Sequence, residues 1–173
     1  MRRKIVLFLI ISICFLLQTT VFQTLSFADI APNLLIIVVS SFGFMRGRKE
    51  GMMVGFFCGL LVDIFCGFYL GVYALIYMYI GFINGIFQKH FYPDDIKLPM
   101  IMIGASDIVS NLVVYFIMFL FRRRFHFGYY LTAIIIPEFV YTMIITIFLY
   151  FILLKINQKL EDYEKRSAKK FEL

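Results

Sequence analysis

Long apolar runs alternate with short polar segments from one end of the chain to the other. Runs of about 20 predominantly apolar residues are typical of helices that cross a lipid bilayer. The polar segments are too short for a separate soluble domain, so we expect one all-α polytopic membrane domain, residues 1–154, with a charged cytoplasmic tail at residues 155–173. Six spans are predicted, over residues 5–27, 32–45, 51–68, 70–87, 99–121 and 129–154.

The second predicted span is short for a bilayer. It has 14 residues, 32–45, whereas a crossing helix usually has at least about 17. Three interpretations fit this length: a helix with little tilt, a helix extended by Asp29, Ile30 and Ala31, and a helix that does not cross fully. The pattern alone leaves these alternatives open.

The composition agrees with a membrane protein. The chain has 173 residues, of which 62% are apolar and 16% charged, and its mean hydropathy is +0.88. Soluble domains are about 45–50% apolar and about 25% charged. The net charge of +6 therefore indicates membrane topology rather than binding to nucleic acid.

The basic residues also predict an orientation. If the N-terminus is cytoplasmic, 14 of the 17 Lys and Arg residues lie on the cytoplasmic side, as the positive-inside rule expects. Arg122, Arg123 and Arg124 are the exceptions. A cleaved signal peptide is the alternative for the N-terminus, because Ser26 and Ala28 resemble a cleavage site. The apolar region of a signal peptide usually has about 7–15 residues, however, and the first apolar run is longer than that. We expect an uncleaved first span and both termini in the cytoplasm.

Glycine recurs every four residues in the third predicted span, and an aspartate occupies the next position of the series. Small residues with this spacing allow two membrane helices to approach closely. Each four-residue step drifts only about 40° around a helix, so these positions form one stripe, which we expect to pack against another helix. The stripe consists of Gly51, Gly55, Gly59 and Asp63; Gly67 and Gly71 are expected in a tight turn, and Gly81 and Gly85 form a second pair in the fourth span.

Three acidic residues fall inside predicted spans: Asp63, Asp107 and Glu138, which follows Pro137. An ionised carboxylate in the bilayer costs about 2.5–3.5 kcal/mol by insertion scales, so each should face protein. No Lys or Arg lies inside a span. We expect these acids to be uncharged and hydrogen-bonded; binding a cation and contacting a partner protein are the alternatives. The expected hydrogen-bonding side chains are those of Gln18, Gln23, Asn33, Asn84, Asn111 and Tyr141.

No motif indicates catalysis, a cofactor or a metal site. Cys14, Cys58 and Cys66 lie within apolar runs without metal-ligand spacing. Neither histidine has a partner motif, and the Pro-Asp-Asp sequence at residues 93–95 stands alone in a short loop. We therefore expect a protein that is not an enzyme.

A series of short motifs runs through residues 31–85. They are Pro32 and Asn33 at the start of the second span, the basic turn Arg46–Lys49, then Gly55, Phe56, Gly59, Leu60 and Asp63 in the third span, and Gly71 and Leu75 in the fourth. On these residues, about half of the chain resembles the family of the rod shape-determining protein MreD. The last two predicted spans resemble the family only in their hydropathy. The resemblance therefore gives no support to Asp107 and Glu138 as functional residues.

The resemblance implies a small membrane scaffold of the bacterial cell-elongation machinery in the plasma membrane, without catalytic activity. It implies association with MreC, the RodA glycosyltransferase, a class B penicillin-binding protein and, in the cytoplasm, MreB. It also implies a six-helix bundle like that of the substrate-binding subunits of energy-coupling-factor transporters, and such a vitamin-binding subunit is the alternative function. Those subunits usually have a small-residue pair on the first span, whereas residues 5–25 contain neither alanine nor glycine, which disfavours the alternative.

Overall fold

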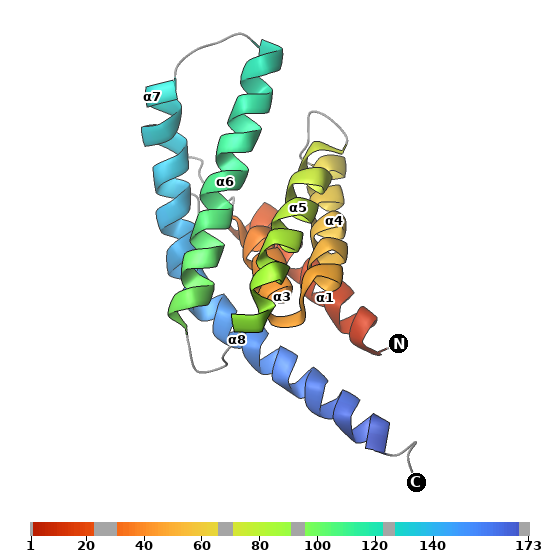
Figure 1. Ribbon diagram of the computed structural model, residues 1–173. Helices are drawn as coiled ribbons and strands as arrows, with labels where there is room; N and C mark the ends of the chain where they lie inside the picture. Colours follow the sequence, from red (N-terminus) through yellow and green to blue (C-terminus); the bar gives the residue numbers. More distant parts are fainter. Residues whose placement is uncertain (1, 23–30, 66–70, 91–95, 123–126, 170–173) are drawn as a thin grey trace.

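The computed structural model describes residues 2–22, 31–65, 71–90, 96–122 and 127–169, and no strand occurs in these ranges (Figure 1). Six helical segments make up the fold. They are α1 (Arg2–Leu16) with the π-helical turn η1 (Leu17–Val21), α3 (Leu34–Arg46), α4 (Arg48–Phe65), α5 (Val72–Ile86) with the 3-10 turn η2 (Phe87–His90), α6 (Lys97–Arg122), and α7 (Phe127–Tyr130), which continues through the π-helical η3 (Leu131–Ile135) into α8 (Ile136–Lys169). The predicted all-α class is confirmed.

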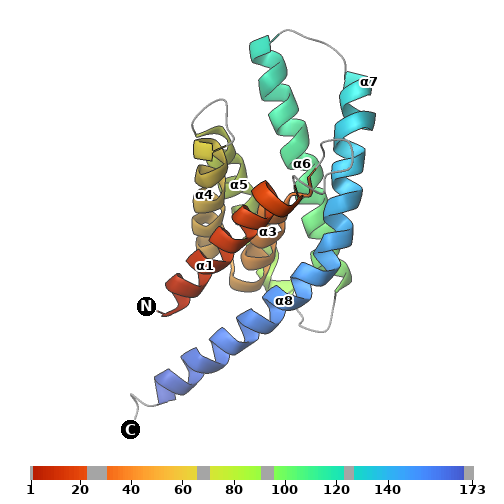
Figure 2. The ribbon, with the colours of Figure 1, turned by 180° about the vertical axis from the view of Figure 1, so that it is seen from behind.

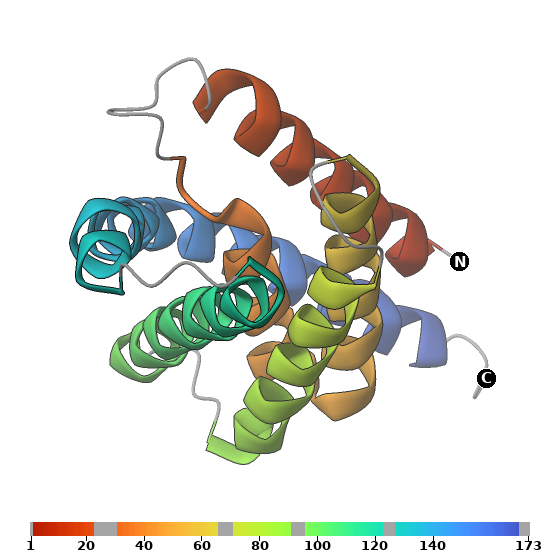
Figure 3. The ribbon, with the colours of Figure 1, turned by 90° about the horizontal axis from the view of Figure 1, so that it is seen from above.

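The short helix α3 lies at the centre of the bundle. Every residue from Leu34 to Met45 is buried, and α3 contacts α1, α4, α5, α6 and α8. Figure 3, along the bundle, shows the other helices around it. A helix that is apolar on all sides, as this one nearly is, belongs in the interior.

The length of α3 bears on the three interpretations of the second span. Its 13 residues extend about 20 Å, less than the core of about 30 Å. The helix begins beside Asn33, which is 7% exposed, so its first turn lies inside the protein. Asp29 and Ile30 are outside the described residues. This part of the chain therefore shows a short helix that starts within the bundle.

Within the described residues, three helices are long and apolar enough to cross a membrane: Arg3–Val21, Lys97–Ile117 and Ile136–Glu164. Compared with the apolar stretches of these helices, α5 is shorter and α4 carries more charged residues. The two form a hairpin, and the contact between them is the most extensive among the described helices. A multi-pass membrane protein follows from this arrangement. The last helix has 34 residues, and its C-terminal part projects past the bundle on the side where α1 begins (Figure 2).

Candidate functional site

The glycine stripe of α4 faces α5. A Cβ atom added at Gly51, Gly55 or Gly59 would collide with a backbone carbonyl oxygen of α5, belonging to Gly81, Tyr77 and Tyr73 respectively. Backbone atoms cannot rotate away as a side chain can. These three positions therefore accept no side chain without separating the two helices.

The contact is reciprocal, and α3 takes part in it. A Cβ at Gly81 would collide with the Gly51 backbone, and one at Gly85 would lie 2.5 Å from the Arg48 Cα. A Cβ at Gly43 of α3 would lie 2.7 Å from the Gly81 carbonyl oxygen. Gly43 was not predicted as a packing residue; it is the single glycine of the second predicted span, and Gly47, four residues further on, lies outside that span. Three helix backbones thus meet at Gly43, Gly51 and Gly81.

Asp63 holds the start of α5. Its Oδ2 accepts hydrogen bonds from the amides of Gly71 (3.0 Å) and Ala74 (2.9 Å), and its Oδ1 accepts one from Tyr73 (3.0 Å). Amides at a helix start lack partners within the helix, and the helix dipole favours a negative group there. These backbone donors take the place of the side chains expected to pair with Asp63.

The turn before α5 requires a glycine. Gly71 has φ of +100°, a left-handed conformation that other residues adopt at a cost, and a Cβ there would meet open space. Glycine is required here because it adopts this backbone conformation readily, and not because another helix packs closely against it. Gly67, the other glycine expected in this turn, lies outside the described residues.

Asn33 joins three helices at the buried start of α3. Its Oδ1 accepts hydrogen bonds from the Ile36 amide (3.3 Å) and the Tyr77 hydroxyl (3.0 Å). Its own amide donates to Oγ1 of Thr142 on α8 (3.1 Å). Gln18 accepts a hydrogen bond from the Leu35 amide at 3.2 Å. Side chains from three parts of the chain therefore accept hydrogen bonds from the amides at the start of α3. Pro32, which is also buried, has no backbone N–H that would need a partner.

Asn84 forms a second polar junction. Its Nδ2 lies 2.8 Å from Oγ of Ser106 on α6 and 3.3 Å from Oγ of Ser40 on α3. It also donates to the Ile80 carbonyl at 2.9 Å. Expected as a partner of the acidic residues, Asn84 instead connects α5 to α3 and α6.

The two remaining acids lie on α6 and α8, which pack against each other. Asp107 is fully buried, and neither carboxylate oxygen makes a hydrogen bond, with Thr142 of α8 as a polar neighbour. Glu138 is close enough to interact with Asp107 and with Asn111, one turn further along α6. The described residues include no group of three His, Cys, Asp or Glu side chains that could hold a metal ion. Asp107 and Glu138 thus lie within electrostatic range of each other on α6 and α8, whereas Asp63 lies on α4.

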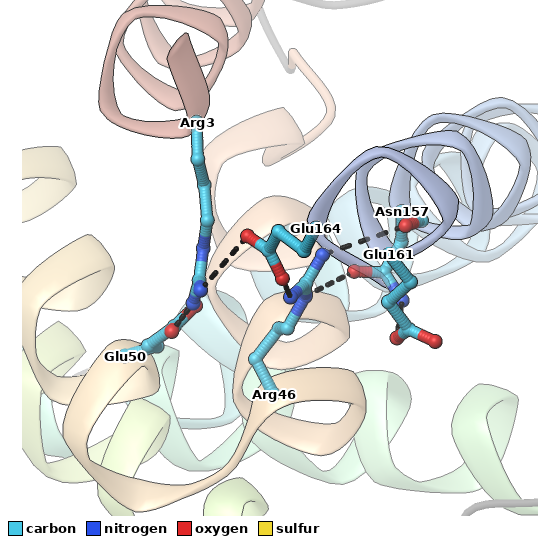
Figure 4. A network of polar contacts seen from close by, with 6 residues as sticks. All are labelled: Arg3, Arg46, Glu50, Asn157, Glu161 and Glu164. Atoms are coloured by element: carbon cyan, nitrogen blue, oxygen red, sulfur yellow. Dashed lines mark hydrogen bonds and ion pairs between the residues drawn. The ribbon is translucent and has the colours of Figure 1, made fainter. Parts of the chain in front are cut away.

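A network of charged side chains connects four helices where α1 and α4 begin (Figure 4). Arg3 pairs with Glu50 of α4 and with Glu164 of α8, the latter at 3.2 Å. Arg46, at the end of α3, pairs with Glu164 at 3.0 Å and donates to Oδ1 of Asn157. Asn157 in turn donates to Glu161 at 3.0 Å.

This network was not predicted from the sequence. The basic residues indicated topology there, and the acidic residues of the tail were treated as part of a solvated segment. The alternation of Glu161 and Glu164 with lysines is the only sequence signal for it. In the structure, Arg46 has only 9% of its side chain exposed, so the network is partly shielded from solvent.

Three large apolar residues of the motifs do not belong to the buried core. Phe56 is 42% and Leu75 is 55% exposed, and Leu60 is half-buried. They lie on α4 and α5 away from the glycine contact. Cys14 and Cys58 are free and buried, whereas Cys66, His126 and residues 93–95 lie outside the described part of the chain.

The fold and its polar junctions define a multi-pass helical membrane protein whose polar side chains hold helices together. The chain matches the family described as rod shape-determining protein MreD over residues 1–160. It therefore belongs to the MreD family, as predicted, and is a non-catalytic, rod shape-determining membrane protein. No curated protein and no solved structure matches the chain. The expected likeness to energy-coupling-factor transporter subunits is thus unsupported.

Proposed function

We propose that this protein is a scaffold of the cell-elongation machinery, which organises peptidoglycan synthesis by binding other membrane proteins. Membership of the MreD family over residues 1–160 carries this proposal. The proposed partners are MreC, RodA and a class B penicillin-binding protein within the membrane, and MreB filaments at the cytoplasmic face. No observation favours the transporter-subunit alternative.

We further propose that the protein resides in the bacterial plasma membrane with both termini in the cytoplasm. The first turn of α1 and the last turns of α8 lie on the same side of the bundle (Figure 1). The network of Arg3, Arg46 and Glu164 joins the start of the chain to its last helix on that side. The positive-inside rule makes this basic side the cytoplasmic one.

The outward faces of α4 and α5 are our proposed docking surface for a partner's membrane anchor. Gly51, Gly55 and Gly59 are already covered by α5, so they are unavailable to a partner. Phe56 and Leu75 belong to the MreD-like motifs and are exposed, so packing within this chain does not account for them. Large apolar side chains of this kind supply much of the energy at helix–helix contacts.

Affinity purification of the tagged protein from its native membrane tests the proposal. Recovery of MreC, RodA or a penicillin-binding protein is the expected result, and recovery of an ATPase-bearing transporter module would contradict it. Phe56→Ala and Leu75→Ala should each lower recovery about fivefold, the effect of a contact of about 1 kcal/mol. Phe116→Ala on α6, where the side chain is 64% exposed, is the matched control and should change nothing.

A further inference from the structure

A groove of about 500 Å³ lies between α1 and α4. Of the described residues that line it, Lys4 alone is charged, and all the others are apolar. The apolar walls include Leu7, Phe8 and Ile11 of α1 and Met53, Phe57 and Leu61 of α4. The groove is therefore an apolar channel with one cationic group.

The position of Lys4 gives the groove a direction. The pair between Arg3 and Glu50 holds the first turns of α1 and α4 side by side, so Lys4 lies at the end where both helices begin. From Lys4 to Ile11 the groove follows α1 for about 10 Å, at about 1.5 Å per residue. One leaflet of the hydrocarbon core is about 15 Å deep. The groove thus fits within a single leaflet, with the lysine at its headgroup end.

The groove is too small to enclose a helix. A helix 10–12 Å wide and 30 Å long fills more than about 2,000 Å³, far more than the groove offers. An acyl chain is narrow and apolar along its length, and it ends at a headgroup in the plane where Lys4 lies. The shape and lining therefore match one chain of a membrane lipid.

The charge of Lys4 selects among lipids. Arg3 is occupied by Glu50 and Glu164, whereas Lys4 takes part in none of the ion pairs found among the described residues. A lysine near the membrane surface attracts anionic headgroups by about 1 kcal/mol. We propose that this groove binds an acyl chain of an anionic phospholipid, whose phosphate is held by Lys4.

Native mass spectrometry of the full-length protein tests the headgroup preference. The protein is purified in mild detergent and supplied with equimolar phosphatidylglycerol and phosphatidylcholine, and the lipids that it retains are counted. Wild-type protein should retain phosphatidylglycerol preferentially, and Lys4→Gln should reduce that preference about fivefold while leaving phosphatidylcholine unchanged. Lys155→Gln, at an exposed position of α8, is the charge-matched control and should retain the preference.

A second variant tests the groove itself. Leu61→Trp should fill it and lower retention of both lipids, whereas Phe148→Trp, at a side chain that is 72% exposed on α8, should not. Equal phosphatidylglycerol retention by wild type and Lys4→Gln would overturn the proposal, even if Leu61→Trp failed to fold. A photo-crosslinker at position 61 that joins a protein rather than a lipid in native membranes would also overturn it.

Discussion

At the scale of single residues, Asp63 determines how the helix α5 begins. One carboxylate accepts hydrogen bonds from three backbone amides where α5 begins, although they lie 8, 10 and 11 residues further along the chain. Amides in the first turn of a helix have no partner within the helix. The carboxylate therefore fixes the angle at which α5 returns along α4.

Replacing Asp63 by asparagine should destabilise the protein. Asparagine has one acceptor oxygen and brings two N–H donors towards amides that are themselves donors. We expect a loss of about 1–3 kcal/mol, the cost of leaving a buried donor unpaired, measured as a lower Tm in detergent. Asp162→Asn, at an exposed position, is the control, and equal Tm values for the two variants would contradict the role of Asp63.

The sequence relates Asp63 to the glycine stripe by its spacing, but it does not reveal its partners. The candidates considered were side chains, and backbone amides become candidates only once the start of α5 is known. Asn33 poses a similar problem, because its partner Thr142 is 109 residues away. A short motif indicates that a residue has a structural role. Its hydrogen-bond partners far along the chain can be identified only once the arrangement of the helices is known.

At the scale of elements, the α4–α5 hairpin depends on backbone contact. Gly59→Leu should prevent it from forming, because even a Cβ at this position would lie 2.5 Å from the Ala74 Cα. We expect loss of monodisperse protein in size-exclusion chromatography, and Gly59→Ala should give a partial loss. Gly128→Ala is the matched control, since nothing lies within 4 Å of a Cβ there. Normal levels and normal partner recovery for Gly59→Leu would refute this account.

Helix content followed from hydropathy, and the helix ends did not. The last predicted span covers only the apolar part of α8, which continues beyond residue 154 to Lys169. Hydropathy marks only where a chain leaves the apolar core, and a helix can continue into water if its side chains find partners. Asn157 and Glu164 find theirs in Arg46. The centrality of α3 was equally hidden, because a short apolar run does not show what surrounds it.

At the scale of the whole molecule, Arg46 attaches the last helix to the bundle. Arg46→Ala removes its contacts with both Asn157 and Glu164, so the end of α8 should open more often. We expect trypsin to cleave after Lys155 and Lys159 several-fold faster, and Arg46→Lys to give a smaller increase because lysine lacks the forked guanidinium donors. Lys49→Ala, at an exposed position, should leave the rate unchanged. Equal rates for Arg46→Ala and wild type would show that α8 is held elsewhere.

The buried start of α3 has a consequence for how the protein is made. The Asn33 amide donates to Thr142, which is synthesised 109 residues later. Arg46 donates to Asn157, which is synthesised 111 residues after it. Until then the Asn33 amide lacks this acceptor, and a helix of about 20 Å does not have the length to span a bilayer. We therefore expect α3 to reach its final place only after α8 has been synthesised.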